Sequence, residues 1–383
     1  MSESYDVIVL GLGGMGSAAA YHLARRGVRV LGLDRFGPAH DQGSSHGDSR
    51  IIRQAYYEDP AYVPLLERAF ELWAELEPEV PGGNMQITGG LLIGRPDSRI
   101  IVGSTRSVQQ WNLPHEILSS DEVSERYPTF TLGADDVGLF EPNAGFVRPE
   151  RTVTAHIDLA RRAGATLRFG ETVRSWQADS SVRGVTVTTD TGMITAGNLV
   201  IAPGAWAPEL LPEIPLVVER QVMYWFAPSG DPARYDPSRH PVYIGANPAG
   251  REFYGFPASE GPTGGAKVAF FRQHDQCTPD TINRDVTLVE SQEMAQFIGS
   301  WLPTLPGRLL RAATCLYTTT PDGHFVVGPH SQYPQVVIAC GFSGHGFKFV
   351  PVIGEILADL ATEAKTRQPI YPLFDPERRA LGR

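Results

Sequence analysis

The chain has 383 residues, 33 of them basic and 43 acidic, and its formal net charge is −10. This balance excludes a general nucleic-acid-binding surface, so we expect no nucleic-acid partner. No apolar run approaches the ~20 residues of a membrane-spanning helix, and the N-terminus lacks the basic and apolar regions of a signal peptide. We therefore expect no membrane partner and a cytoplasmic location. The three cysteines are an odd number without metal-ligand spacing, which predicts neither a disulfide framework nor a metal site.

A G-x-G-x-x-G pattern lies near the N-terminus, at Gly11, Gly13 and Gly16. It follows an apolar run of strand length, residues 7–10, and precedes a helical stretch. In a βαβ unit the first glycine permits a tight turn, the second lets the backbone approach a pyrophosphate, and the third lets the helix pack on the sheet. The start of the helix offers unpaired N–H groups and a positive dipole end to phosphates. The pattern predicts a dinucleotide site.

A second strand is expected at residues 28–33, and it runs into Asp34. Asp34 follows Gly16 at about the distance at which an acid of such a unit accepts a hydrogen bond from a ribose hydroxyl. A glycine-rich turn in another kind of α/β protein is the alternative interpretation. It leaves the position of Asp34 to coincidence.

The segment GSSHGDSRIIR, residues 43–53, carries His46, Asp48, Arg50 and Arg53. Its two isoleucines indicate that it is partly buried, and buried arginines need anionic partners. In a nucleotide-binding protein these anions are a cofactor phosphate, a substrate carboxylate or a negatively charged flavin. A polar surface loop is the alternative, and the residues alone do not decide between the two.

The middle of the chain alternates helical and strand patterns. Asp59 and Pro60 form a typical helix N-cap and first position, and apolar residues recur at helical spacing to about residue 77. Further helices are expected at residues 100–111, 115–127 and 149–163, and strands at residues 86–93, 165–176, 184–189 and 199–202. From residue 217 to about 314 the pattern favours strands with Pro- and Gly-rich turns, which predicts an antiparallel sheet above a cofactor.

A second strand–glycine loop–helix unit lies near the C-terminus. A buried strand at residues 335–339 precedes the loop CGFSGHGFKF, which carries His345 and Lys348, and an apolar helical face follows. Glycines and a lysine beside a helix start make a second anion site. Two such sites suit a ligand that is charged at both ends.

Four stretches together carry a specific resemblance: GSSHGDSRIIR, FYGFP, TCLYTTTPDGHF and GFSGHGFKF. The chain resembles, over nearly its full length, the flavin amine oxidases of the D-amino-acid-oxidase superfamily. It is most similar to the monomeric sarcosine oxidase and N-methyltryptophan oxidase family. The resemblance implies a monomer with FAD extended between the first βαβ unit and the C-terminal loop.

The resemblance also implies the fold and the reaction. The expected fold is α/β, with a discontinuous Rossmann-type FAD-binding domain (residues 1–85, 145–215 and 318–383) and an α+β substrate domain with a mainly antiparallel sheet (residues 86–144 and 216–317). The expected reaction is oxidation of a secondary α-amino acid such as sarcosine or a bulkier N-methyl amino acid. Hydride passes to the flavin, O2 reoxidises it to give H2O2, and the imine hydrolyses to the amino acid and formaldehyde.

Site residues follow from the same resemblance. The family attaches its flavin covalently through a cysteine, which here is Cys315, although a free cysteine is by itself more often a small buried hydrophobe. The expected catalytic residues are Lys267, which activates oxygen, Arg50, His46 and Tyr254. The expected substrate-binding residues are Arg53 and Lys348, which hold the carboxylate, with Tyr254 and Phe271. The expected cofactor-binding residues are Gly11, Gly13, Gly16, Asp34, Arg35, Ser44, His46, Arg50, Val173, Gly204, Trp206, Cys315, Gly344, Gly346 and Lys348.

Phe271 departs from the pattern of the family, in which sarcosine oxidases have a histidine lining the pocket. A phenyl ring makes the pocket more apolar and removes a hydrogen-bond partner. We therefore expect a substrate bulkier or more apolar than sarcosine, such as a larger N-methylated or a cyclic amino acid.

Several other interpretations share parts of this pattern. Two keep the fold: an oxidase of a cyclic (L-pipecolate or proline type) or fructosyl amino acid, and a flavin amine dehydrogenase with another electron acceptor. Lys267 favours oxygen. An NAD-dependent dehydrogenase would leave the C-terminal loop unexplained, and a non-catalytic nucleotide-binding module would leave the buried arginines and lysines without a use.

Overall fold

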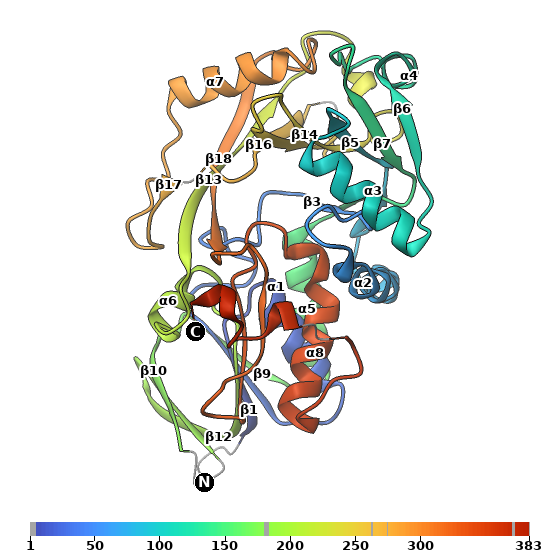
Figure 1. The fold of residues 1–383 in the computed structure, drawn as a ribbon. Coiled ribbons are helices and arrows are strands. Elements are labelled where there is room, and N and C mark those ends of the chain that lie inside the picture. Colours follow the sequence, from blue (N-terminus) through green and yellow to red (C-terminus); the bar gives the residue numbers. More distant parts are fainter. Residues whose placement is uncertain (1–4, 180–183, 262, 274, 370–371, 383) are drawn as a thin grey trace.

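The computed structural model describes residues 5–179, 184–261, 263–273, 275–369 and 372–382. Within these residues the molecule is elongated, with one sheet in each half (Figure 1). The half drawn below in Figure 1 contains the first βαβ unit and the C-terminal helix, so it joins the two ends of the chain. The predicted combination of a Rossmann-type unit with a second, α+β part is confirmed.

The first sheet contains the predicted dinucleotide-binding unit. Its strands β1 and β2 are parallel, with Val7 opposite Val30, and β12 lies parallel to β1 on the other side. The spatial order is β10 (Val173–Ala178), β11 (Val185–Thr189), β12 (Gly192–Ile201), β1 (Tyr5–Leu10), β2 (Val30–Asp34) and β9 (Thr166–Phe169), while β20 (Val336–Cys340) pairs with β12 and with β19 (Val326–Pro329). Three distant stretches of chain therefore meet in one sheet.

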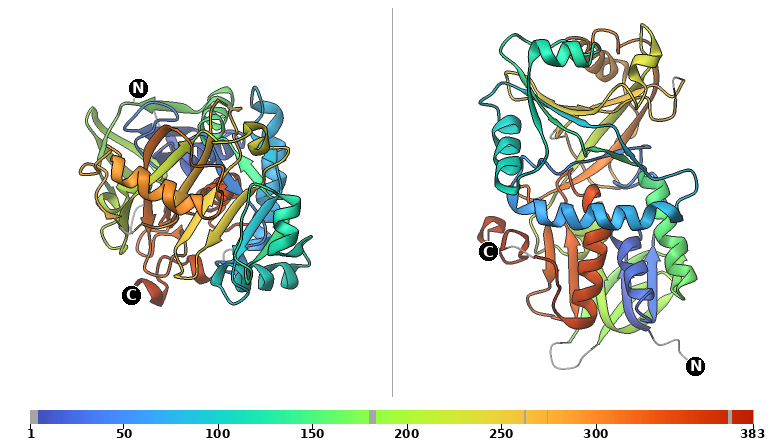
Figure 2. Two further views of the ribbon diagram at one scale, coloured as in Figure 1. Left: turned by 90° about the horizontal axis from the view of Figure 1, so that it is seen from above. Right: turned by 90° about the vertical axis from the view of Figure 1, so that its right-hand side faces the viewer.

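Helices α1 (Gly14–Ala24), α5 (Pro149–Arg162) and α8 (Val350–Glu363) pack beside one another on this sheet (right-hand view of Figure 2). Their close approach depends on small residues. A Cβ atom built on Gly354 would lie 2.5 Å from the Cβ of Ala18, so α8 can lie this near to α1 only with glycine there. The two glycine loops, one at the start of each helix, are thereby brought to the same end of the sheet.

The second sheet forms the core of the other half and is mainly antiparallel, as predicted; within the described residues only β5 and β14 pair in parallel. Helices α3 (Arg99–Trp111), α4 (Ser120–Arg126) and α7 (Leu288–Gly299) lie around it (Figure 1). The spatial order is β17 (Asp275–Gln276), β13 (Val217–Phe226), β16 (Ala266–Phe270), β15 (Glu252–Gly255), β14 (Val242–Ala246), β5 (Gly90–Gly94), β7 (Val137–Glu141) and β6 (Glu116–Ser119), and β18 (Leu309–Thr319) pairs with β13.

A small antiparallel sheet and one helix lie between the two halves. The sheet consists of β3 (Arg50–Ile52), β8 (Gly145–Val147) and β4 (Met85–Ile87), and the helix α2 (Val63–Leu76) crosses the molecule at this level (Figure 2). Asp59 caps the start of this region as predicted, because its side chain accepts a hydrogen bond from the Ala61 N–H at 2.8 Å. The first turn, residues 60–62, is a 3₁₀ helix that leads into α2.

Two sequence predictions for the second half were wrong. Residues 115–127 do not form one helix, because residues 116–119 pair with β7 as strand β6 and Ser119 then caps α4 in a capping box with Glu122. Residues 86–93 do not form one strand, because Gly89 has a φ of +73° and separates β4 from β5. The Ser119 cap therefore sets the boundary between β6 and α4, and Gly89 sets the boundary between β4 and β5.

A short helix, α6 (Ala207–Leu210), follows the end of β12.

None of the described helices is both long and apolar enough to cross a bilayer.

Candidate active site

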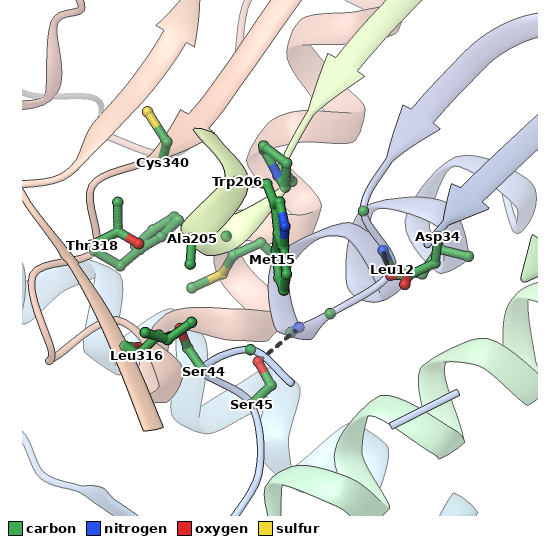
Figure 3. Close-up of a pocket in the computed structure, with 18 of the residues that line it drawn as sticks. Leu12, Met15, Asp34, Ser44, Ser45, Ala205, Trp206, Leu316, Thr318 and Cys340 are labelled. Carbon is green, nitrogen blue, oxygen red and sulfur yellow. Dashed lines mark hydrogen bonds between the residues drawn. The ribbon is translucent and has the colours of Figure 1, made fainter. Parts of the chain in front are cut away.

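A long cavity runs from the glycine turn after β1 to the loop after β20 (Figure 3). Its empty volume is about 1510 Å³, including the part that is open to solvent. Residues 10–15, 33–36, 43–45, 202–206 and 339–344 all contribute to its walls. The cavity therefore joins the two glycine-rich loops that the sequence indicates as anion sites.

The glycine turn has the geometry that the spacing of its glycines predicts. Gly11 has a φ of +83°, and a Cβ atom there would lie 2.5 Å from the carbonyl oxygen of Ala202. A Cβ atom on Gly16 would lie 1.7 Å from the carbonyl oxygen of Gly11, so Gly16 serves the packing of α1 on β1 and lies outside the cavity lining. Gly13 faces more open space, since a Cβ atom there would lie 3.7 Å from Ser45 Oγ.

Ser45 adds a contact that the sequence analysis did not identify. Its hydroxyl accepts a hydrogen bond from the Gly14 N–H at 3.1 Å and so ties the segment 43–53 to the first turn of α1 (Figure 3). The neighbouring Ser44 donates its hydroxyl hydrogen to the carbonyl of Leu316 at 2.6 Å. The only signal in the sequence was the pair of serines in GSSHG.

Asp34 ends β2 inside the cavity, as its position after the second strand predicts. Its two carboxylate oxygens accept backbone N–H bonds from Leu12 at 2.7 Å and Phe36 at 2.8 Å. Burial raises the pKa of Asp34, and these two bonds oppose the rise. Each oxygen keeps a lone pair for a further donor such as a ribose hydroxyl.

The cavity wall fits an extended dinucleotide. Because Gly13 has no side chain, a ligand in the cavity can approach its backbone. Gly204 has a φ of +59°, and a Cβ atom there would meet nothing within 4 Å. Among the described residues, the buried Nε1 of Trp206 has no hydrogen-bond partner, which leaves one donor in the wall unused. The predicted cofactor residues that line the cavity are Gly11, Gly13, Asp34, Arg35, Ser44, Arg50, Val173, Gly204, Trp206, Gly344 and Gly346.

Three more of the predicted cofactor residues, His46, Cys315 and Lys348, are buried beside that lining. The Nη2 atom of Arg50 donates to the carbonyl of Ser44 at 2.9 Å and lies 3.6 Å from the sulfur of Cys315. Arg50 thus connects the cavity to Cys315.

Cys315 has a reactive environment. Burial raises the pKa of its thiol, but a hydrogen bond with His46 and the charge of Arg50 outweigh burial and lower the pKa to about 7. A large fraction of this thiol is therefore thiolate near neutral pH, which is the nucleophilic form. By contrast, burial raises the pKa of Cys340 well above its ordinary value, and the opposing charge of Arg378 does not offset it.

Lys267 lies in β16 and is 1% exposed. Its ammonium group donates to the carbonyl of Gly47 at 2.8 Å and to that of Ser49 at 2.6 Å. The nitrogen also lies 3.9 Å from the centre of the Phe256 ring. Two carbonyl acceptors and an aromatic face favour the protonated amine.

The charges around Lys267 act in both directions. Burial lowers the pKa of Lys267 well below its ordinary value, and the charge of Arg50 lowers it further. Asp48, Glu150 and Cys315 raise it. Burial and Arg50 thus favour the neutral amine of Lys267, whereas Asp48, Glu150 and Cys315 favour its ammonium form.

Arg53 and Lys348 approach the same aromatic ring from different parts of the chain. The guanidinium carbon of Arg53 lies 4.3 Å, and the Lys348 nitrogen 5.3 Å, from the centre of the Tyr56 ring. Burial and the charge of Arg53 lower the pKa of Lys348 to about 7, while Glu58 opposes them. Such a pair of buried cations is suited to an anionic ligand.

Glu58 was missed by the sequence analysis, and it pairs with Arg53 at 2.6 Å. Both side chains are almost completely buried, at 3% and 5% exposure. Burial raises the pKa of Glu58, but Arg53 outweighs burial and lowers it to about 2. The signal that was present is an acid five residues after an arginine in an otherwise apolar and aromatic stretch.

Tyr254 and Phe271, two of the predicted substrate residues, contact a cavity-lining aromatic residue without being part of the cavity lining themselves. The hydroxyl of Tyr254 lies 3.4 Å from that of Tyr317, a cavity-lining residue that the sequence analysis did not identify. The rings of Phe271 and Tyr317 are 5.9 Å apart, centre to centre. A Cβ atom on Gly344 would lie 2.5 Å from Tyr317 and 3.0 Å from Phe271, so the C-terminal loop packs directly on this pair.

Comparison with known proteins agrees with this architecture. The family model described as FAD dependent oxidoreductase matches residues 6–360. The monomeric sarcosine oxidase of Streptomyces avermitilis is 54% identical over 100% of both chains, and the N-methyl-L-tryptophan oxidase of Salmonella heidelberg is 36% identical over 93% of this chain and 94% of that protein.

Among solved structures, NikD is described as an unusual amino acid oxidase essential for nikkomycin biosynthesis. It aligns with a TM-score of 0.84 at 28% identity over 98% of each chain. The dinucleotide cavity, the two glycine loops and these full-length matches agree with one another. The chain belongs to the family of FAD-dependent oxidoreductases, in the group that contains the monomeric sarcosine oxidases and the N-methyl-L-tryptophan oxidases.

Proposed function

We propose that the protein is an FAD-dependent oxidase of secondary α-amino acids that acts on sarcosine or a bulkier N-methyl amino acid. When bound, FAD accepts the hydride of the C–H bond beside the nitrogen, and its reoxidation by O2 yields H2O2. The imine product hydrolyses to the demethylated amino acid and formaldehyde. The names of the two relatives, a sarcosine oxidase and an N-methyl-L-tryptophan oxidase, support this substrate class.

The observation that carries the proposal is the pair of buried cations at one aromatic ring. Arg53 and Lys348 lie against Tyr56, and an amino acid brings a carboxylate that suits both of them. Charge-assisted hydrogen bonds contribute about 1.5–3 kcal/mol each. We assign Arg53 and Lys348 to the substrate carboxylate, which orients the amine toward the cavity.

The aromatic wall supports a preference among substrates. Phe271 and Tyr317 pack together, and Tyr254 presents its hydroxyl to that of Tyr317. Phe271 offers an apolar face and excludes water, whereas it has no hydrogen bond to give to a small polar substrate. We therefore propose that an N-methyl amino acid larger than sarcosine, or a cyclic one, is turned over better than sarcosine.

The experiment is anaerobic bleaching of the flavin by a panel of amines, followed by air and measurement of peroxide. The panel contains sarcosine, N-methyl-L-alanine, N-methyl-L-tryptophan, L-pipecolate, L-proline and a fructosyl amino acid. Bleaching by an N-methyl amino acid, with rapid recolouring and stoichiometric H2O2, is the expected result. Bleaching with slow recolouring would contradict the oxidase, and no bleaching by any amine would contradict the substrate class. Sarcosine turning over fastest would contradict only the preference for a larger substrate.

We further propose that the flavin is attached covalently to Cys315 through its 8α-methyl group. The lowered pKa of Cys315, the hydrogen bond with His46 and the proximity of Arg50 support this assignment. After acid precipitation, the yellow colour is expected to stay with the wild-type pellet and to leave with the supernatant of Cys315→Ser. Cys340→Ser is the matched control, and it should keep its flavin. Flavin released from the wild type would refute the attachment.

A monomeric state and a cytoplasmic location complete the proposal. None of Cys277, Cys315 and Cys340 is in a disulfide bond, which agrees with a reducing compartment. Sedimentation of the purified protein at micromolar concentration tests the monomer.

A further inference from the structure

Glu150 lies in the first turn of α5 and makes two backbone contacts with a distant turn of the chain. Its Oε1 atom accepts hydrogen bonds from the N–H of Gly47 at 2.5 Å and from the N–H of Asp48 at 3.2 Å. The two bonds end on a single oxygen. Neither the dinucleotide cavity nor the substrate residues described above account for this contact.

The turn that Glu150 holds is the one that binds Lys267. The carbonyls of Gly47 and Ser49 accept the two hydrogen bonds of the lysine nitrogen, at 2.8 and 2.6 Å. The two N–H groups bound by Glu150 thus alternate along the chain with the carbonyls that hold the lysine. The Asp48 N–H and the Gly47 carbonyl belong to one peptide group, so a rotation that released Asp48 from Glu150 would also move one of the two acceptors of Lys267.

The conformation of this turn needs outside support. Gly47 has a φ of +95°, and Asp48 has a φ of +66°, a left-handed conformation that non-glycine residues rarely adopt. Residues in such regions persist where the surroundings hold them, at a cost of about 1–3 kcal/mol each. The surroundings here are the Glu150 carboxylate, an ion pair between Asp48 and Arg311, and the bond from Arg50 Nη1 to the Ser49 carbonyl at 2.9 Å.

We propose that Glu150 is a positioning residue for the reaction of the reduced enzyme with oxygen, because it holds the residue 47–49 turn whose carbonyls place the Lys267 ammonium. The inference rests on the proposed function, and specifically on the role of Lys267 toward oxygen. Glu150 lies outside the lining of the cavity, and its proposed action is to accept the two N–H bonds of the turn. Its charge, which also raises the pKa of Lys267, is removed in Glu150→Gln and is thereby tested separately. Its loss should therefore affect the oxygen reaction and leave the reduction of the flavin by substrate unchanged.

The variants separate acceptance from bulk and charge. Glu150→Ala removes the acceptor, whereas Glu150→Gln keeps an oxygen at the position of Oε1 that can accept both N–H bonds. Glu122→Ala is the control, because Glu122 accepts the backbone N–H of Ser119 at 2.7 Å in the capping box at the exposed start of α4. If Glu150→Ala does not fold, Glu150→Asp takes its place, since its shorter side chain cannot span to both N–H groups.

The holoenzymes are reduced anaerobically, once with the best amine and once with dithionite, and are mixed with O2 in a stopped-flow instrument. Glu150→Ala is expected to reoxidise about tenfold more slowly, since small misplacements of an electrostatic group have effects of this size or larger. Its rate of reduction by the amine should equal that of the wild type. Glu150→Gln should lie within about threefold of the wild-type reoxidation rate, and Glu122→Ala should match the wild type in both reactions.

A second readout does not depend on turnover. Hydrogen–deuterium exchange of the oxidised holoenzyme should be faster at the amides of residues 47–49 in Glu150→Ala, and unchanged there in Glu150→Gln and Glu122→Ala. Equal slowing of both half-reactions, an unchanged reoxidation rate, or a Gln variant as slow as Ala would each overturn the proposal. Dithionite-reduced enzyme keeps this test separate from the amine panel, while a wild-type reoxidation rate in Lys267→Met would remove both the role of Lys267 and this inference.

Discussion

Lys267 and Arg53 are two buried basic side chains for which we propose different roles, and their partners differ in charge. Lys267 is held by the neutral carbonyls of Gly47 and Ser49, whereas Arg53 is paired with the carboxylate of Glu58. Neutral acceptors orient the lysine without cancelling its charge, so its field is available to a second molecule. The arginine pair is neutral as a whole, and a substrate carboxylate must compete with Glu58 for the guanidinium. This difference matches the roles that we propose, in which Lys267 acts on oxygen through its charge and Arg53 binds the substrate carboxylate.

The strongest test of this contrast is Lys267→Met. Removing one preorganised charge where an anion develops typically slows a reaction about 10²–10³-fold. We expect reoxidation by O2 to slow by this factor and reduction by the amine to change little, as measured in separate anaerobic and aerobic stopped-flow experiments. Lys365→Met, at an exposed position after α8, is the control. Equal slowing of both half-reactions would show that Lys267 does not act on oxygen.

Glu58→Gln tests the Arg53–Glu58 ion pair through its effect on protein stability. The variant leaves Arg53 buried without a charged partner, and we expect a loss of about 2 kcal/mol in the free energy of unfolding at pH 7. A carboxylate ligand should raise the Tm of the variant more than that of the wild type, because it replaces the missing anion. An equal rise in both proteins would contradict the idea that ligand and Glu58 compete for Arg53.

The same pair predicts a pH dependence. The pKa of Glu58 falls from an ordinary value of 4.5 to about 2 in the folded protein. A lowered carboxyl pKa stabilises the fold above pH 4.5, and this stabilisation is lost as the pH falls toward 2. Wild type and Glu58→Gln should therefore converge in stability over that interval, as followed by urea unfolding at each pH.

Lys348 gives the smallest expected effect. Burial and Arg53 lower its pKa to about 7, so the ammonium is present below pH 7 and is lost above it. The Kd of a substrate carboxylate should accordingly increase from about pH 7 upward, by about tenfold for the loss of one charge-assisted hydrogen bond. In Lys348→Arg the guanidinium stays charged, and the increase should vanish. An identical pH profile in the two proteins would assign the titration to another group.

The first βαβ unit was predictable because its information is local. The spacing of Gly11, Gly13 and Gly16 is read within six residues, Gly16 packs on Gly11, and Asp34 follows the next strand directly. Boundaries in the second half were less predictable. Residues 116–119 became a strand because β7 was available to pair with them, and their own sequence contains no sign of that partner.

The chain has only three lysines, and the two that the resemblance assigns to the site are 1% and 6% exposed. With only three lysines among 33 basic residues, a lysine in this chain was a signal for a functional position, because arginine supplies nearly all other cations. No comparable signal pointed to Tyr317, Ser45 or Glu150. Their residue types are common in the sequence, and their roles depend on the distant residues that they contact in the fold.

The sequence by itself determined the cofactor-binding unit, the second glycine loop and the identity of the cations, because backbone sterics and charge are properties of single residues and short spacings. Only the tertiary structure decided which anion faces which cation. Glu58 is five residues from Arg53 and neutralises it, while Glu150 lies about a hundred residues from Gly47 and, by holding its peptide group, sets the position of Lys267. Such long-range pairings depend on how α5, β16 and the residue 43–53 segment pack together, and no local pattern records that arrangement.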